Sequence, residues 1–189
     1  MEQWMIYNSY NTKMKEPTKI LSEEHQYILK VIGALNRECD AVDNGKSLDK
    51  KFFEKAIDFI RNYADKFHHA KEEDILFKEL CKDDVNMHCN PTEQMRYEHD
   101  LGRNFVKEME QALKENNKKK ILENARGYTQ LLQDHIYKED NILYPMADEA
   151  LNEEKKKLML KKFKEAESKR FTKGTKEKYL ELAREFEKW

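Results

Sequence analysis

The chain of 189 residues contains only five glycines and three prolines. These residues mark most turns, so their scarcity favours long helices over the many short strands of a sheet protein. No stretch approaches the ~20 consecutive apolar residues that span a bilayer. The N-terminus carries no basic segment followed by an apolar run, as a secretory leader would. We therefore expect neither a membrane-spanning helix nor a membrane partner.

The chain also lacks an excess of charge of either sign. Its 36 basic and 37 acidic residues give a formal net charge of −1. This balance gives no reason to expect nucleic acid or an acidic membrane surface as a partner. Charged residues nevertheless make up 39% of the chain, which implies a large solvated helix surface.

Cysteine is scarce as well, because Cys39, Cys81 and Cys89 form an odd set with no paired spacing. Such a set argues against a disulfide-built secreted domain and fits a reducing compartment, so we expect a cytoplasmic protein. Cys81 and Cys89 flank His88, which makes a small second metal site conceivable. The short spacings typical of zinc sites are absent, and this disfavours the second site.

Helical periodicity is abundant between residues 18 and 147. Apolar residues advance there in steps of four and three along four segments, which is the pattern of a buried helix face. The second segment has one extra step of four beside His68. Short turns between such helices predict an all-α, up-down-up-down four-helix bundle. The four stripes are Leu21, His25, Ile28, Ile32, Leu35 and Cys39; Phe53, Ile57, Ile60, Ala64, His68, Glu72 and Ile75; Met95, His99, Gly102, Val106, Met109 and Leu113; and Ile121, Ala125, Tyr128, Leu132, His135, Glu139 and Ile142.

Two segments flank the expected bundle. Residues 1–17 form an N-terminal arm, and residues 148–189 form a C-terminal helical extension. The extension carries two apolar sets, each spaced for one helix face, so we expect it to pack on the bundle or on a second copy in a homodimer. The sets are Leu158, Phe163 and Ala166, and Tyr179, Leu180, Ala183, Phe186 and Trp189.

One segment of the chain is written twice, 67 positions apart. His68-His-Ala-Lys-Glu72-Glu-Asp-Ile-Leu-Phe corresponds to His135-Ile-Tyr-Lys-Glu139-Asp-Asn-Ile-Leu-Tyr. On a helix, residues four apart lie ~6 Å from each other on one face. Each copy can therefore direct an imidazole and a carboxylate at one point, and two copies suggest a metal centre inside the bundle.

Two further histidines complete this layer. His25 and His99 lie about two turns from the starts of the first and third expected helices, at the depth of His68 and His135. Four imidazoles and two carboxylates would then converge in an apolar core, where unpaired charges cost several kcal/mol each. Metal cations remove this cost. The mixed nitrogen and oxygen donors suit iron or manganese, and zinc is also compatible.

Other polar residues near the layer leave alternatives open. His69 and Glu73 are also four apart and offer a competing register, but Ile136 occupies the position equivalent to His69, which favours His68 and Glu72. We expect His69 at the surface or supporting a ligand. Three tyrosines are expected near the layer as hydrogen-bond donors or, more simply, as packing residues: Tyr27, Tyr97 and Tyr128.

Over residues 18–147 the chain resembles the hemerythrin-like (HHE cation-binding) family. The resemblance rests on His25 in Ser-Glu-Glu-His, on the two copies of the duplicated segment and on His99 in Tyr-Glu-His-Asp-Leu-Gly-Arg. It implies two iron ions with an oxo or hydroxo bridge. Glu72 and Glu139 would bridge the irons, and His25, His68, His99 and His135 would be terminal ligands.

The resemblance has two departures. Oxygen-carrying members have a second histidine one turn after the position of His99, where this chain has Arg103. They also use an aspartate five residues after the last histidine, where this chain has Glu139 at four. Fewer imidazoles at one iron favour reactive chemistry or sensing over reversible oxygen carriage.

The expected function is binding or sensing of O2, peroxide or nitric oxide at an open iron position. One alternative is an iron-dependent enzyme that removes peroxide or reduces nitric oxide. Another is an iron-handling or sensing module in which residues 148–189 report the occupancy of the site. A metal-free interaction bundle is the remaining alternative, and it would tolerate alanine at His68 or His135.

Overall fold

A computed structural model describes residues 16–189, and this part of the chain is helical, with no strand. The all-α class is therefore confirmed. The expected N-terminal arm lies almost entirely outside the described residues. The elements are α1 (Pro17–Asp43), α2 (Lys50–Phe59), η1 (Ile60–His69), η2 (Glu72–Leu76), α3 (Phe77–Leu80), α4 (Thr92–Lys114), α5 (Lys118–Lys138), η3 (Glu139–Leu143), α6 (Tyr144–Ala150), α7 (Glu153–Arg170) and α8 (Thr175–Glu187).

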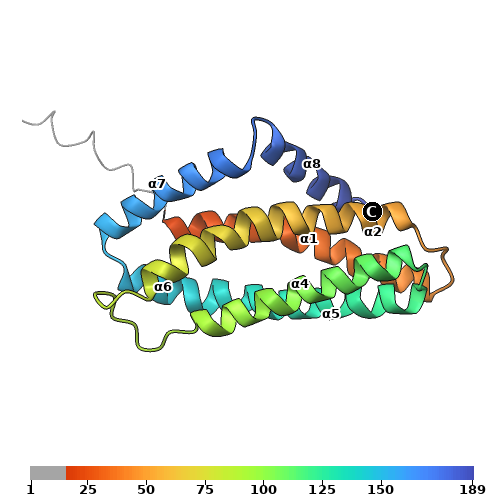
Figure 1. The fold of residues 1–189 in the computed structure, drawn as a ribbon, viewed down its shortest axis with the longest axis horizontal. Coiled ribbons are helices and arrows are strands. Elements are labelled where there is room, and N and C mark those ends of the chain that lie inside the picture. Colours follow the sequence, from red (N-terminus) through yellow and green to blue (C-terminus); the bar gives the residue numbers. More distant parts are fainter. Residues whose placement is uncertain (1–15) are drawn as a thin grey trace, which may run out of the picture.

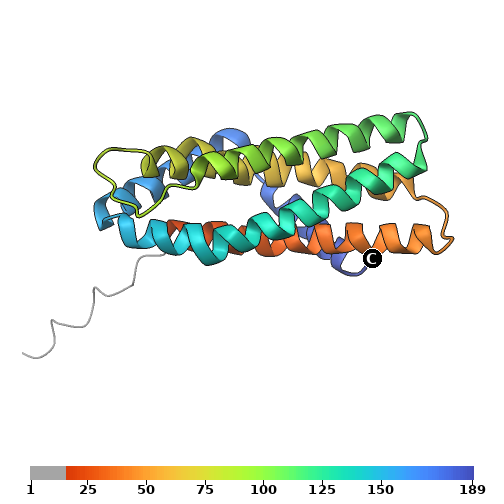
Figure 2. The same ribbon diagram turned by 90° about the horizontal axis from the view of Figure 1, so that it is seen from below.

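Four long helical rods lie side by side (Figures 1 and 2). They are α1, the continuous run from α2 to α3, α4, and the continuous run from α5 to α6. The connections at 44–49 and 115–117 lie at one end of the rods, and the loop at 81–91 lies at the other. Each pair of neighbouring rods can thus bury its apolar stripes along most of its length.

Local sequence explains where these rods begin and end. The Asp49 side chain accepts hydrogen bonds from the amides of Lys51 and Phe52, and the Asn117 side chain accepts one from the amide of Lys120. These bonds satisfy amides that have no partner within a first helical turn. After α1, Gly45 takes a φ of 99°, a left-handed conformation that glycine adopts without a steric penalty.

Both copies of the duplicated segment contain π-helical turns. The second rod is π-helical at Ile60–His69 and Glu72–Leu76, and the fourth is π-helical at Glu139–Leu143. A π turn closes over one more residue than an α turn and is often found at functional sites. It accounts for the extra step of four that the sequence shows beside His68.

The apolar core consists of two clusters. Along each rod, the residues of the expected histidine layer come between the residues of one cluster and those of the other. One cluster contains Leu35, Phe53 and Tyr128, and the other contains Leu21, Leu76 and Leu143. The buried polar residues of the rods, among them His25 and Glu139, fall between these sets along the chain. A packed interior therefore encloses the polar layer on both sides, which removes it from water.

The C-terminal extension packs on the face formed by α1 and α2 (Figure 1). The Phe171 ring stacks on Phe67 with 4.4 Å between centroids, and Phe186 meets Phe52 edge-on at 5.1 Å. The expected packing of Leu158 on the bundle is wrong, because this residue is exposed, whereas Trp189 is partly exposed but its ring lies 5.1 Å from that of Phe52. Met159 takes the buried place of Leu158, one position round the helix. Within residues 16–189, no helix combines the length and apolar character that a bilayer crossing requires.

Candidate metal centre

The six residues that the sequence singles out meet inside the bundle. Each is buried, with at most 1% of its surface exposed. α1 supplies His25, η1 supplies His68, η2 supplies Glu72 and α4 supplies His99. His135 and Glu139 come from the junction of α5 and η3.

The four imidazoles form two pairs. The rings of His25 and His68 lie 4.6 Å apart between centroids, and those of His99 and His135 lie 4.7 Å apart. Within the second pair, the two Nε2 atoms are 3.0 Å from each other. Each pair can thus present two ring nitrogens to one point.

Each glutamate lies between the two pairs. Glu72 Oε2 is 3.6 Å from His68 Nε2 and 3.5 Å from His99 Nε2. Glu139 Oε2 is 3.3 Å from His25 Nε2, and Glu139 Oε1 is 3.3 Å from His135 Nε2. A carboxylate placed in this way has access to both imidazole pairs, which is the arrangement that a bridging ligand of two cations needs.

The carboxylate oxygens fit a cation better than they fit the protein. Glu72 Oε2 and both carboxylate oxygens of Glu139 are buried and make no hydrogen bond among the described residues. A buried oxygen without a donor costs about 1–3 kcal/mol. Coordination of a cation would satisfy these atoms and neutralise the two carboxylates, so the residues present fit a metal.

Protons hold the cluster together when no metal is bound. Burial raises the pKa of Glu72 well above its usual range, and the neighbouring Glu139 adds to the rise. Burial acts in the same direction on Glu139, but the imidazoles of His135 and His25 outweigh it and hold that pKa well below its usual range. When no metal is bound, Glu72 therefore holds its proton more tightly than Glu139 does.

The same charges divide the histidines. Burial lowers the pKa of every core imidazole, but Asp140 and Glu139 outweigh it at His25 and raise that pKa to about 9. Glu139 and Glu98 likewise raise the pKa of His135 to about 10. Burial, with a contribution from His69, lowers the pKa of His99 to about 3. A metal must therefore displace protons from His25 and His135 in order to bind.

Each of the four core histidines turns its Nδ1 atom toward a carboxylate. The distances are 3.0 Å from His25 to Asp140, 3.0 Å from His68 to Glu24, 2.7 Å from His99 to Glu73 and 2.8 Å from His135 to Glu98. A carboxylate at Nδ1 fixes the ring so that Nε2 faces the centre, an arrangement typical of metal-binding histidines. Asp140, Glu24 and Glu98 were missed from the sequence, although each is adjacent to a proposed ligand, and Glu73 was considered there only as a competing ligand.

The structure corrects two expectations about neighbouring residues. His69 is buried, with 6% of its surface exposed, so of its two expected positions the one at the surface is wrong and the one beside a ligand remains, since its ring stacks on His99. One of its ring nitrogens lies within 4.8 Å of a ring nitrogen of His99 and of His135. The expected position of Tyr97 near the histidine layer is also wrong, because this residue is 58% exposed.

His69 belongs to a second group of donor side chains. A ring nitrogen of His69, with those of His99 and His135, forms one of two sets that could hold a cation, and the other set is His25, His68, Glu72 and Glu139. The His69 ring stacks on His99, with 3.7 Å between centroids and 12° between planes. His69 is therefore a candidate third imidazole at this half of the centre, in addition to the six residues that the sequence singled out.

Tyr144 was missed as a member of the centre. Its hydroxyl donates a hydrogen bond of 2.5 Å to Glu72 Oε1 and lies 3.4 Å from His25 Nε2. Its ring stacks on His25 at 5.6 Å. The equivalent residue of the first copy, Phe77, has no hydroxyl and stacks on His99 at 5.9 Å. The tyrosine therefore makes the two halves of the centre chemically different.

Arg103 occupies the position where oxygen carriers have a second histidine. Its side chain binds carboxylates around the centre and none of the six proposed ligands. Its guanidinium donates to Glu73 at 2.6 Å, to Asp65 at 2.8 Å and to Asp100 at 2.8 Å. Through Glu73 it supports His99 and adds no donor atom. Cys81, His88 and Cys89 are exposed, and they belong to none of the metal-capable clusters found among the described residues.

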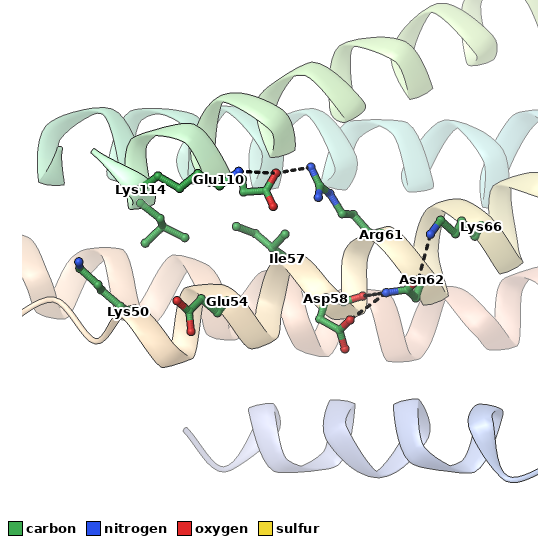
Figure 3. A pocket seen from close by; sticks show the side chains of 10 residues that line it. Lys50, Glu54, Ile57, Asp58, Arg61, Asn62, Lys66, Glu110 and Lys114 are labelled. Atoms are coloured by element: carbon green, nitrogen blue, oxygen red, sulfur yellow. Dashed lines mark hydrogen bonds and ion pairs between the residues drawn. The ribbon is translucent and has the colours of Figure 1, made fainter. Parts of the chain in front are cut away.

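Two of the hollows beside the rods help to locate the site. A cavity of about 160 Å³ reaches His69 and His99 from the side of α4. A larger groove of about 600 Å³ between α2 and α4 contains the Arg61–Glu110 ion pair of 2.7 Å (Figure 3). None of the proposed ligands lines the larger groove, so we place the candidate centre in the histidine layer and not there.

These features define a helical protein with a buried cluster of histidines and glutamates that is suited to binding cations. The model of the hemerythrin HHE cation binding domain matches residues 16–147. The chain therefore belongs to the hemerythrin family. Comparison with curated proteins and with solved structures gives no match.

Proposed function

We propose that this protein holds two iron ions in an up-down-up-down four-helix bundle and uses them to bind or sense O2, peroxide or nitric oxide. The position of Glu72 and Glu139 between the two imidazole pairs carries the proposal. The chain connections at alternate ends of the rods support the topology.

The donor set favours iron or manganese among the common metals. Each half offers at least two imidazole nitrogens and access to one oxygen of each glutamate, and His69 adds a third imidazole at one half. There is no thiolate among these donors, since the buried Cys39 packs in the apolar cluster. Zinc in structural sites is satisfied by four ligands, whereas iron and manganese accept six. Six-coordination would leave positions for a bridging oxygen and a small ligand.

Bound iron would supply electrons and an open coordination position for a diatomic molecule or peroxide. The chain supplies the surroundings. Asp140, Glu24, Glu73 and Glu98 orient the four imidazoles, and the apolar clusters keep water away. Tyr144 holds a proton within reach of Glu72 and can donate it to a polar ligand at this half of the centre.

Metal analysis of anaerobically purified protein tests the proposal, followed by optical spectra on addition of O2. Two irons per chain and a new absorption band in the near ultraviolet or visible range would support it. A stable band that disappears on removal of O2 would indicate reversible carriage. Protein that binds no iron when offered it would refute the proposal.

Tyr144 favours one second candidate, an enzyme that reduces peroxide or nitric oxide at the same centre. Reduction of peroxide to water consumes two electrons and two protons, so an external reductant must restore the irons after each turnover. Rapid peroxide loss with added reductant, abolished by Glu139→Ala, would support the enzyme. Peroxide loss no faster than with free iron would exclude it.

A further inference from the structure

The cavity beside His69 lies between the second rod and α4 and α5. Its deeper wall is mostly apolar and buried, with Ile60, Val106 and Leu132 among its residues. The partly exposed residues Asp65 and Arg103 mark its outer end. His69 and His99, both buried, line its inner part.

We propose that this cavity is the binding site and entry route of a small uncharged ligand, such as O2, nitric oxide or hydrogen peroxide, on its way to the histidine layer. The proposal rests on the proposed function and adds a route and residues to it. A volume of about 160 Å³ admits a molecule of two to four atoms and excludes the larger substrates that occupy typical ligand pockets.

The charged side chains at the outer end of the cavity are paired with one another, which disfavours the entry of ions. Arg103 is committed to Asp65 and Glu73, and Arg61 is committed to Glu110. These pairs neutralise each other, so neither guanidinium is available to an anion. An ion that passed them would lose its hydration against apolar walls, at a cost of several kcal/mol. An uncharged ligand avoids this cost.

A buried polar group in the wall offers a specific contact. The hydroxyl of Tyr128 makes no hydrogen bond among the described residues, whereas the Nδ1 atom of His69 faces Asp65 at 3.5 Å. Burial raises the pKa of Tyr128, so its hydroxyl keeps its proton and remains a donor. A buried hydroxyl of this kind normally has a partner. A ligand with an acceptor atom would provide one.

Gly102 keeps the cavity open on the α4 side. A Cβ atom built at this position would lie 3.5 Å from Tyr128 Cε2 and 3.9 Å from Leu131 Cδ2. Alanine therefore fits in ordinary van der Waals contact, whereas the longer side chain of leucine would extend into the cavity that Gly102 lines. The helix does not require glycine here, since only Gly45 and Gly174 have positive φ among the described glycines.

The experiment compares Gly102→Leu and Gly102→Ala with Gly33→Leu. Gly33 lies on α1 and meets only Arg37 Nη1, at 3.5 Å, so the control adds the same side chain to a helix away from the cavity. Circular dichroism and iron content establish that each variant folds and loads. Nitric oxide association with the reduced, iron-loaded protein is then followed optically after rapid mixing.

We expect Gly102→Leu to slow association about tenfold, which corresponds to about 1.4 kcal/mol in the barrier. Gly102→Ala should slow it less, and Gly33→Leu should match the wild type. If Gly102→Leu does not fold, the association rate of Gly102→Ala is compared with that of the wild type instead. An unchanged rate in the folded Gly102 variants, with normal iron content, would overturn the proposal.

Xenon provides a readout that needs no metal. In crystals of the full chain under xenon pressure, we expect a xenon atom in the cavity of the wild type and of Gly33→Leu, and none in Gly102→Leu. No xenon in the wild type would overturn the cavity as a site. A protein that binds xenon there and no iron would refute the proposed function and leave the cavity intact as a small-ligand site.

Discussion

Lys71 and Lys138 occupy equivalent positions in the duplicated segment, and each ammonium group binds the glutamate that precedes a core histidine. Lys71 binds Glu24, and Lys138 binds Glu98. Their surroundings differ, because the side chain of Lys71 is 1% exposed and that of Lys138 is 35% exposed. The same contact is thus buried at one half of the centre and partly solvated at the other.

The C-terminal extension contributes to this difference. Lys71 Nζ lies 3.6 Å from the centroid of the Phe67 ring and 5.9 Å from that of Phe163, which belongs to α7. Phe171, which follows α7, stacks on Phe67. The family match ends at residue 147, so a segment outside it lies against the residues that orient His68.

We expect Lys71→Met to cost much more stability than Lys138→Met. Loss of Lys71 leaves the buried Glu24 without its cation, and breaking a buried pair in this way costs about 3–5 kcal/mol. Loss of the more exposed Lys138 should cost below about 1 kcal/mol. Urea unfolding of both metal-free variants, with the wild type alongside, measures the difference. Equal losses would show that the extension does not isolate the Lys71 contact.

Glu139→Ala should lower the iron content from two per chain to one or none. The residue lies between both imidazole pairs, so its loss removes an oxygen donor from each half of the centre. Iron analysis and the optical spectrum measure the effect. Glu110→Ala is the matched control, because Glu110 pairs with Arg61 at the larger groove. Two irons in Glu139→Ala would rule out a bridging role for Glu139.

The metal-free protein should become less stable as the pH rises from 7 to 10. The folded-state pKa is about 9 for His25 and about 10 for His135, both above the ordinary value of 6.5. The stability that these protons contribute is complete below pH 6.5 and is lost as the pH passes through the folded-state values.

Bound metal replaces these protons, so the iron-loaded protein should not show this loss. The difference in Tm between loaded and metal-free protein should therefore grow from pH 7 to pH 10, as calorimetry can measure. A difference that stays constant over this range would mean that His25 and His135 do not exchange protons for metal.

Tyr144→Phe should destabilise the metal-free protein by about 1 kcal/mol, the usual value of one buried hydrogen bond. The hydroxyl donates to Glu72, which has few other partners. Tyr63→Phe is the control, because the buried hydroxyl of Tyr63 makes no hydrogen bond among the described residues. Chemical unfolding of the two variants should separate them. A larger loss in Tyr63→Phe would contradict the expected order.

The proposed ligands could be found in the sequence because local geometry determines them. A histidine and a glutamate four residues apart share a helix face wherever the helix lies, so His68 with Glu72 and His135 with Glu139 required only helical periodicity. His25 and His99 followed from their places in two apolar stripes. The duplicated copies then favoured the register of His68 over that of His69, although a ring nitrogen of His69 also lies close to His99 and His135.

The residues around the ligands depended on neighbouring helices, and the sequence did not reveal them. Glu24 contacts His68 on another rod, 44 positions away, and Glu98 contacts His135 in the same way. A signal was present, since a glutamate precedes both His25 and His99, but it has meaning only once the rods are side by side. Tyr144 likewise becomes part of the centre only through its contact with Glu72.

By itself, the sequence determined most of the side chains that face the interior of the bundle, because helical periodicity is a local property of the chain. Ile142 is an exception, since it is exposed and Leu143, in the same π-helical stretch, is buried instead. Only the tertiary structure decided what those side chains meet. It turned His69 inward onto His99, left Tyr97 in solvent and placed the extension over Lys71. The physical reason is that packing between helices depends on π-helical turns and long-range contacts, which no single stretch of sequence specifies.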